Sequence, residues 1–115
     1  MTRSEIMETL RYACEHRKVC SAHFLNEPEE RLINPLGVAY SSKNTLIIVC
    51  ILVKGFSESK NNQFFRNLQF VKCEKVEVLD RKFSIHKDFN PEDGQYKTWL
   101  FHATMDPFPE KIFFV

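Results

Sequence analysis

Four cysteines and four histidines are the residues that most directly suggest metal or nucleophile chemistry. The cysteines lie six, thirty and twenty-three residues apart, so the sequence has no Cys-x-x-Cys pair of the kind that binds zinc. Cys20 and His23 are three residues apart in a strand-like pattern and point to opposite faces, which argues against a thiolate–imidazole pair. No nucleophile-elbow sequence or glycine-rich phosphate loop is present. We therefore predict a protein that is not an enzyme and requires no metal or cofactor.

Basic residues are concentrated in the middle of the chain. The net charge is only +1, but residues 43–87 contain nine basic and four acidic side chains, whereas residues 88–115 contain two and five. A balanced total argues against a protein that binds polyanions with its whole surface. Two interpretations of the basic middle remain open: a solvated strand face, or a local site for an anionic ligand.

Hydrophobic periodicity predicts the elements that must position these side chains. Residues 4–18 have apolar side chains at helical spacing, with Ser4 as the expected N-cap. Residues 19–80 change to the alternating pattern of strands, in which Pro35 predicts an edge, a bend or a bulge. The polar turn at 41–44 predicts an antiparallel hairpin between its two neighbours. The expected strands are 19–25, 32–40, 45–54, 63–71 and 76–79.

Five short strands favour a small closed barrel, because closure removes exposed sheet edges. Asn90-Pro-Glu-Asp93 is typical of a helix start and predicts a second helix over residues 90–104. An apolar tail over 108–115 must then cover the barrel, add a strand to it, or pair with another copy. The expected interface residues are Phe108, Ile112, Phe113 and Phe114. We predict one domain over residues 1–115, mainly β with flanking helices.

The sequence favours a reducing compartment. Its first residues show no apolar segment of the kind that marks a secretory signal. The longest apolar run, Leu46–Val53, has eight residues, far fewer than the roughly twenty that span a bilayer. We therefore expect a cytoplasmic protein with free cysteines and no membrane partner.

Several short stretches resemble, in order and spacing, the WYL domain, a bacterial regulatory module with an Sm-like or SH3-like β-barrel. They are His16-Arg-Lys-Val19, Asn34-Pro-Leu-Gly-Val-Ala-Tyr40, the run over residues 68–83, and Asp88-Phe89. The resemblance implies a five-stranded barrel preceded by one helix and followed by another. It also implies that the barrel senses an anionic ligand, single-stranded nucleic acid or a nucleotide, in transcription control or phage defence.

The resemblance also indicates where a ligand would bind. The Trp-Tyr-Leu triplet of the family falls on Asn44, Thr45 and Leu46, and its paired basic positions fall on Gln69 and Lys72. A nucleic-acid ligand needs cations for phosphate and polar or aromatic groups for bases. The expected ligand-binding residues are Lys43, Asn44, Thr45, Arg66, Gln69, Lys72, Ser21 and His23. The alternative is a protein-interaction module without ligand sensing, acting as a homodimer or with a separate effector protein.

Overall fold

The computed structural model describes residues 1–54 and 65–112 and begins with helix α1 (Arg3–His16). The N-cap is Thr2 rather than the expected Ser4, because Thr2 and Glu5 form a capping box. The Thr2 hydroxyl accepts from the Glu5 N–H at 3.1 Å, and the Glu5 carboxylate accepts from the Thr2 N–H at 2.8 Å. The helix buries one apolar face, made of Ile6, Met7, Leu10, Ala13 and Cys14.

The described residues contain six strands, one more than expected. They are β1 (Lys18–Phe24), β2 (Arg31–Ser41), β3 (Leu46–Lys54), β4 (Phe65–Gln69), β5 (Cys73–Lys82) and β6 (Tyr96–His102), with the 3-10 turn η1 (Phe70–Lys72) between β4 and β5. The first five correspond to the five predicted strands, although β5 is much longer than residues 76–79. The expected residues 63 and 64 of the fourth strand lie outside the described part of the chain.

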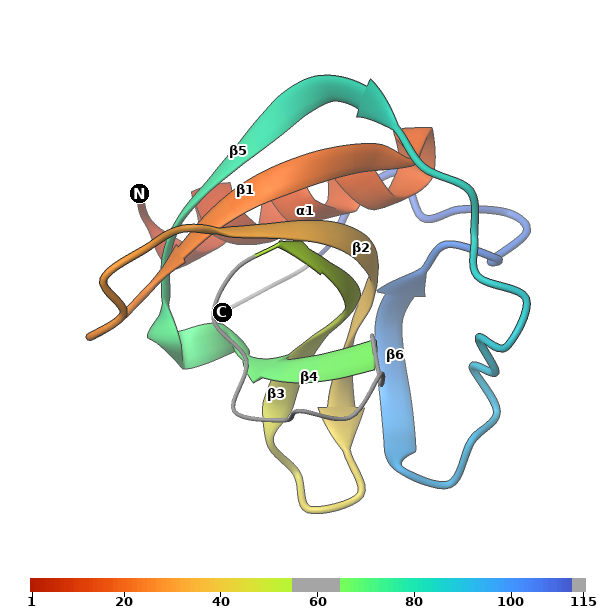
Figure 1. Ribbon diagram of the computed structural model, residues 1–115. Coiled ribbons are helices and arrows are strands. Elements are labelled where there is room, and N and C mark those ends of the chain that lie inside the picture. Colours follow the sequence, from red (N-terminus) through yellow and green to blue (C-terminus); the bar gives the residue numbers. More distant parts are fainter. Residues whose placement is uncertain (55–64, 113–115) are drawn as a thin grey trace.

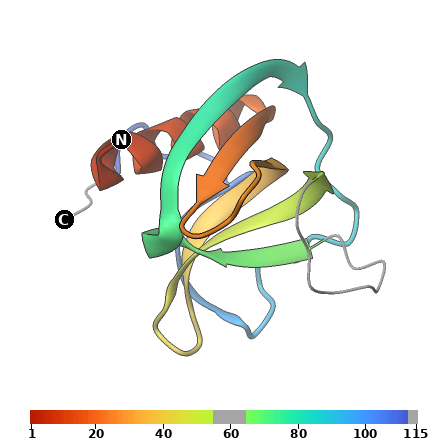
Figure 2. The ribbon, with the colours of Figure 1, turned by 60° about the vertical axis from the view of Figure 1, so that its left-hand side comes forward.

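All strand pairs are antiparallel, and the sheet has the order β4-β3-β2-β1-β5 with β6 added to β2. The sheet curls strongly, and α1 lies across one side of the curl (Figures 1 and 2). Within residues 1–54 and 65–112, the outer strands β4 and β5 do not pair with each other. The closed barrel that we expected is therefore not formed; the sheet is open, with α1 packed against β1, β2 and β5.

The predicted hairpin at 32–54 is confirmed, since β2 pairs with β3 from Leu32–Lys54 to Tyr40–Leu46. The expected irregularity at Pro35 is also confirmed, because the register shifts between Pro35 and Gly37. This bend lets the first part of β2 pair with β1 and its last part pair with β6. One long strand thereby joins both parts of the sheet.

The expected helix over residues 90–104 is wrong, because the chain there turns twice and enters β6. The Asn90 side chain accepts from the Glu92 N–H at 3.0 Å, and the Asp93 side chain accepts from the Gln95 N–H at 3.0 Å. These side chains form turns instead of capping a helix. The chain then pairs with β2 from Ser41–Tyr96 to Gly37–His102. Pairing with β2 therefore determines the structure of this segment, although its apolar residues have helical spacing.

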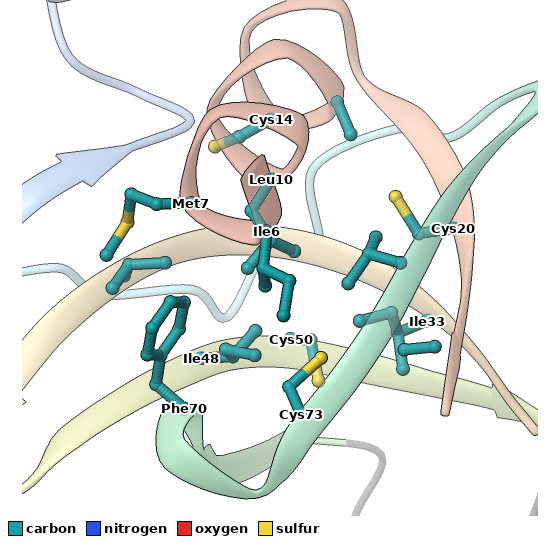
Figure 3. Close-up of a cluster of buried hydrophobic side chains, with 14 of the residues drawn as sticks. Ile6, Met7, Leu10, Cys14, Cys20, Ile33, Ile48, Cys50, Phe70 and Cys73 are labelled. Atoms are coloured by element: carbon teal, nitrogen blue, oxygen red, sulfur yellow. The ribbon is translucent and has the colours of Figure 1, made fainter. Parts of the chain in front are cut away.

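Two apolar clusters lie on opposite faces of the β2–β3 hairpin. The first fills the curl beneath α1 and includes residues from α1, β1, β2, β3, η1 and β5 (Figure 3). The second consists of Leu36, Ile47 and Val49, covered by side chains of β4, the segment 83–95 and β6. Burial on both faces explains why β3 has a continuous apolar sequence.

The described part of the C-terminal tail packs on its own molecule. Phe108 and Ile112 lie against the first apolar cluster, and the Phe101 and Phe108 ring centroids are 6.0 Å apart. An Arg11 guanidinium N–H donates to the Pro109 carbonyl at 3.2 Å. Of the four expected interface residues, Phe108 and Ile112 therefore cover the core. Phe113 and Phe114 lie outside the described residues.

Candidate ligand-binding surface

Three of the expected ligand residues form the exposed turn between β2 and β3. The Ser41 hydroxyl accepts from the Lys43 N–H at 3.3 Å and the Thr45 N–H at 3.2 Å. Asn44 has the left-handed φ of 63°, which asparagine tolerates better than most residues. The turn thus holds its own backbone and leaves the side chains of Lys43, Asn44 and Thr45 exposed.

Side chains of β4 and β6 join this turn. The Ser42 N–H donates to the Gln95 carbonyl at 2.9 Å, and Lys97 Nζ donates to Asn44 Oδ1 at 2.8 Å. Asn67 Nδ2 donates to Gln95 Oε1 at 2.7 Å, and Figures 1 and 2 both show the start of β6 beside the hairpin. Gln69, which pairs with Ile47, lies on the same face of β4 as Asn67. We call this surface the hairpin face: Lys43, Asn44, Thr45, Asn67, Gln69, Gln95 and Lys97.

The hairpin face combines two cations with exposed amide and hydroxyl groups. Among the described residues, no carboxylate lies within ion-pair distance of Lys43 or Lys97. Asp93, the acid nearest to Lys97 along the sequence, borders the hairpin face, where its side chain accepts from the Gln95 N–H at 3.0 Å. Lysine ammonium groups suit phosphate, and the amides can donate to and accept from base edges.

Ser21 and His23 lie on β1 in acidic surroundings, away from the hairpin face. The Ser21 hydroxyl donates to Glu30 Oε2 at 2.5 Å. The His23 ring lies 3.7 Å from Glu74 Oε1 and 3.2 Å from the Glu27 carbonyl oxygen. Carboxylates and a carbonyl at these positions repel an anion. The structure therefore does not bring these two residues into one anion site with the others.

Arg66 and Lys72 also lie apart from the hairpin face. Arg66 pairs with the buried Cys50, on the opposite face of β4 from Asn67, and its guanidinium donates to the Phe65 carbonyl at 2.8 Å. Lys72 is exposed on η1, where its carbonyl accepts from the Leu25 N–H at the end of β1. Of the eight expected ligand residues, the structure groups Lys43, Asn44, Thr45 and Gln69.

Half-buried rings cover the second apolar cluster beside the hairpin face. Trp99 lies at the centre of these rings. Its ring centroid is 4.7 Å from the ring centroid of Tyr96, 5.1 Å from that of His102 and 5.9 Å from that of Phe89. The Trp99 Nε1 donates to the Pro91 carbonyl at 2.8 Å. Burial raises the pKa of Tyr96 and lowers the pKa of His102. We call this set the aromatic layer: Phe65, Phe83, His86, Phe89, Tyr96, Trp99 and His102.

The four cysteines are free thiols buried in the first apolar cluster. Figure 3 shows them on four different elements around the same interior. Burial raises the pKa of Cys20 and Cys50 to about 12 and that of Cys73 to about 11. The described ranges contain no group of three His, Cys, Asp or Glu residues that could hold a metal ion. These thiols act as small apolar side chains.

Sequence reasoning missed Asn67, Gln95 and Lys97. The expected helix over 90–104 gives no indication that Lys97 lies beside the turn at 41–45. The signal that could have found it is the concentration of aromatic and β-branched residues over residues 96–101, which favours a strand. The expected strand over 63–71 includes Asn67, but the amide contact of Asn67 with Gln95 depends on β6.

The chain matches no known family model and no curated protein sequence. Among the described residues, no helix is long and apolar enough to cross a membrane.

Proposed function

We propose that this protein is a non-enzymatic regulatory module whose hairpin face binds an anionic ligand, with single-stranded nucleic acid or a nucleotide as the ligand class. The observation that carries the proposal is the contact of Lys97 with Asn44. It brings a cation from β6 to the turn that bears Lys43, while Asn44 itself is neutral and leaves the lysine charge uncompensated. Phosphate binding by such lysines is stronger at low salt.

A WYL-like, SH3-like assignment is part of this proposal. The chain runs β1 to β4 as a meander, passes through a 3-10 turn, and returns so that β5 pairs with β1. This connectivity is that of a curled sheet approaching a small barrel, and α1 precedes it as the resemblance implies. Under this hypothesis the module acts in the cytoplasm, in transcription control or phage defence, through a separate effector protein.

The test is fluorescence anisotropy of a labelled oligothymidine of roughly four nucleotides, near the lower limit of an OB-fold site, at about 50 mM salt. We expect the wild-type protein to bind, and the variant Lys43→Gln with Lys97→Gln to bind at least about tenfold more weakly. The loss of two phosphate contacts should make the slope of log binding constant against log salt concentration less steep by about 1.4.

The matched control is Lys72→Gln with Lys75→Gln, which removes two exposed lysines from η1 and β5. It should retain binding within about twofold, because neither lysine belongs to the hairpin face and salt weakens the attraction of charges that do not contact the phosphate. Equal loss in both double variants would show non-specific attraction and contradict a site at the hairpin face. Absence of binding by the wild-type protein at low salt would refute the proposed function and favour the protein-interaction alternative.

A further inference from the structure

A second group of cations lies at the end of the β1–β5 ladder. Lys18 of β1 is directly paired with Lys82 of β5, and the Phe83 N–H donates to the Arg17 carbonyl at 2.9 Å. These two contacts bring positions 17–18 and 81–83, distant in sequence, to one place. We call this surface the basic corner: Arg17, Lys18, Arg81 and Lys82.

The charges of the basic corner are poorly compensated within the protein. Within residues 1–54 and 65–112, the ion pair at this corner joins Lys18 Nζ to Asp80 Oδ1 at 3.3 Å, and the Asp80 side chain is fully exposed. The other nearby acid, Glu15, lies 3.3 Å from the His16 ring. Among the described residues, no carboxylate is within ion-pair distance of Arg17, Arg81 or Lys82. Like charges paired directly across two strands repel each other, and an anion between them would relieve that repulsion.

The basic corner and the hairpin face lie at opposite ends of the molecule, joined by the aromatic layer. Figures 1 and 2 both place the end of β5 at the top and the β2–β3 turn at the bottom. The segment 83–95 runs from the end of β5 to the start of β6 (Figure 1). Phe83 and Phe89 of this segment and Tyr96 of β6 all belong to the aromatic layer. The molecule therefore has two cationic ends on either side of the partly buried rings of the aromatic layer.

We propose that the basic corner binds phosphate groups of the same ligand that the hairpin face binds, so that the ligand is a single-stranded nucleic-acid chain rather than a mononucleotide. This inference rests on the proposed function. Cations that follow the backbone, with aromatic side chains between them, are the combination that binds single strands without a strict sequence requirement. The longest dimension of the molecule is 35 Å, so only an oligonucleotide can contact both ends.

The test compares labelled oligothymidines of roughly four and twelve nucleotides with three proteins of full length. They are the wild type, the corner variant Arg81→Gln with Lys82→Gln, and the control Lys72→Gln with Lys75→Gln, on η1 and at the start of β5. We expect the wild type to bind the long oligonucleotide at least about tenfold more tightly than the short one. The corner variant should bind the short oligonucleotide as the wild type does, but should bind the long one no more tightly than the short one. The control variant should bind both oligonucleotides as the wild type does.

Two results overturn the inference, and they are distinguishable from failure of the proposed function. If the corner variant binds the long oligonucleotide as the wild type does, the corner is not a ligand surface although the hairpin face still binds. If a mononucleotide competes for the wild type as well as the long oligonucleotide does, the ligand is not a chain. If the wild type binds no oligonucleotide at about 50 mM salt, both proposals fail together. Thermal unfolding of each variant shows whether lost binding reflects lost folding.

Discussion

At the scale of single residues, burial determines the chemistry of the cysteines and of His102. The four thiols lie in one apolar cluster, and desolvation is the largest cause of each raised pKa. The same effect lowers the pKa of His102, because burial disfavours the charged imidazolium. Both kinds of group are therefore neutral in the folded protein under ordinary conditions.

The thiols should be unreactive in the folded protein. Their folded pKa values lie above the ordinary value of 9.0, so little thiolate is present at about pH 8. We expect no fast reaction with a disulfide reagent in buffer and reaction of all four cysteines in urea. For the same reason, stability should fall as the pH rises above 9.0, where unfolded thiols ionise and folded ones do not. A thiol that reacts at once in the native protein would contradict this.

His102 should make the protein less stable in mild acid. Its folded pKa lies below 6.5, so the unfolded state binds more protons as the pH falls through 6.5, and the contribution of the neutral ring to stability is lost. Denaturant unfolding between about pH 7.5 and 5 should show a smaller decrease for His102→Gln than for the wild type. If the stability of the two proteins depends on pH in the same way, the pKa of His102 is not lowered by folding.

At the scale of elements, the pairing of β2 with β6 depends on Gly37. A Cβ built at Gly37 would lie 2.4 Å from the Phe101 carbonyl oxygen and 2.7 Å from the Trp99 ring, and the Gly37 φ of 156° disfavours other residues. The bend at Pro35 and the absence of a side chain at Gly37 together allow β6 to approach. The hairpin face therefore depends on this glycine although the glycine is not part of it.

Gly37→Ala should destabilise the protein by about 3 kcal/mol, because either the strands separate or the Trp99 ring shifts. The matched control is Gly94→Ala, since nothing lies within 4 Å of a Cβ at Gly94. Urea unfolding of the two variants provides the measurement, with Gly94→Ala expected to be nearly neutral. A Gly37→Ala protein as stable as the wild type would show that β6 does not pack as described.

The sequence was sufficient for elements whose patterns are local. The amphipathic stripe of α1 and the apolar run of β3 predicted both elements closely, and Pro35 predicted the irregularity in β2. The strand β6 could not be predicted in this way, because Asn90 and Pro91 favour a helix start as much as a turn. Its pairing with β2 is a tertiary contact, and the site residue Lys97 was lost with it.

At the scale of the whole molecule, the tail completes the first apolar cluster. Phe108 and Ile112 pack on that cluster, and the Pro109 carbonyl accepts from Arg11 of α1. This arrangement gives the tail a role inside one molecule. It also lets the alternative of a tail-mediated dimer be tested directly.

A chain ending at Asp106 should be less stable by about 2–3 kcal/mol, since it loses the partly buried side chains of Phe108 and Ile112. Sedimentation should give the same oligomeric state for the full and shortened chains, and urea unfolding should show the loss of stability. A full chain that sediments as a dimer beside a stable monomeric short chain would contradict the packing role and support the dimer alternative.

The proposed function depends on the hairpin face being the ligand surface. The most direct measurement is an NMR titration of the isotope-labelled protein with an unlabelled oligothymidine of roughly four nucleotides at low salt. We expect amide shifts confined to residues 41–45, 67–69 and 95–98, the segments that form and adjoin this surface. Shifts centred on Ser21 and His23, or no shifts at all, would contradict it.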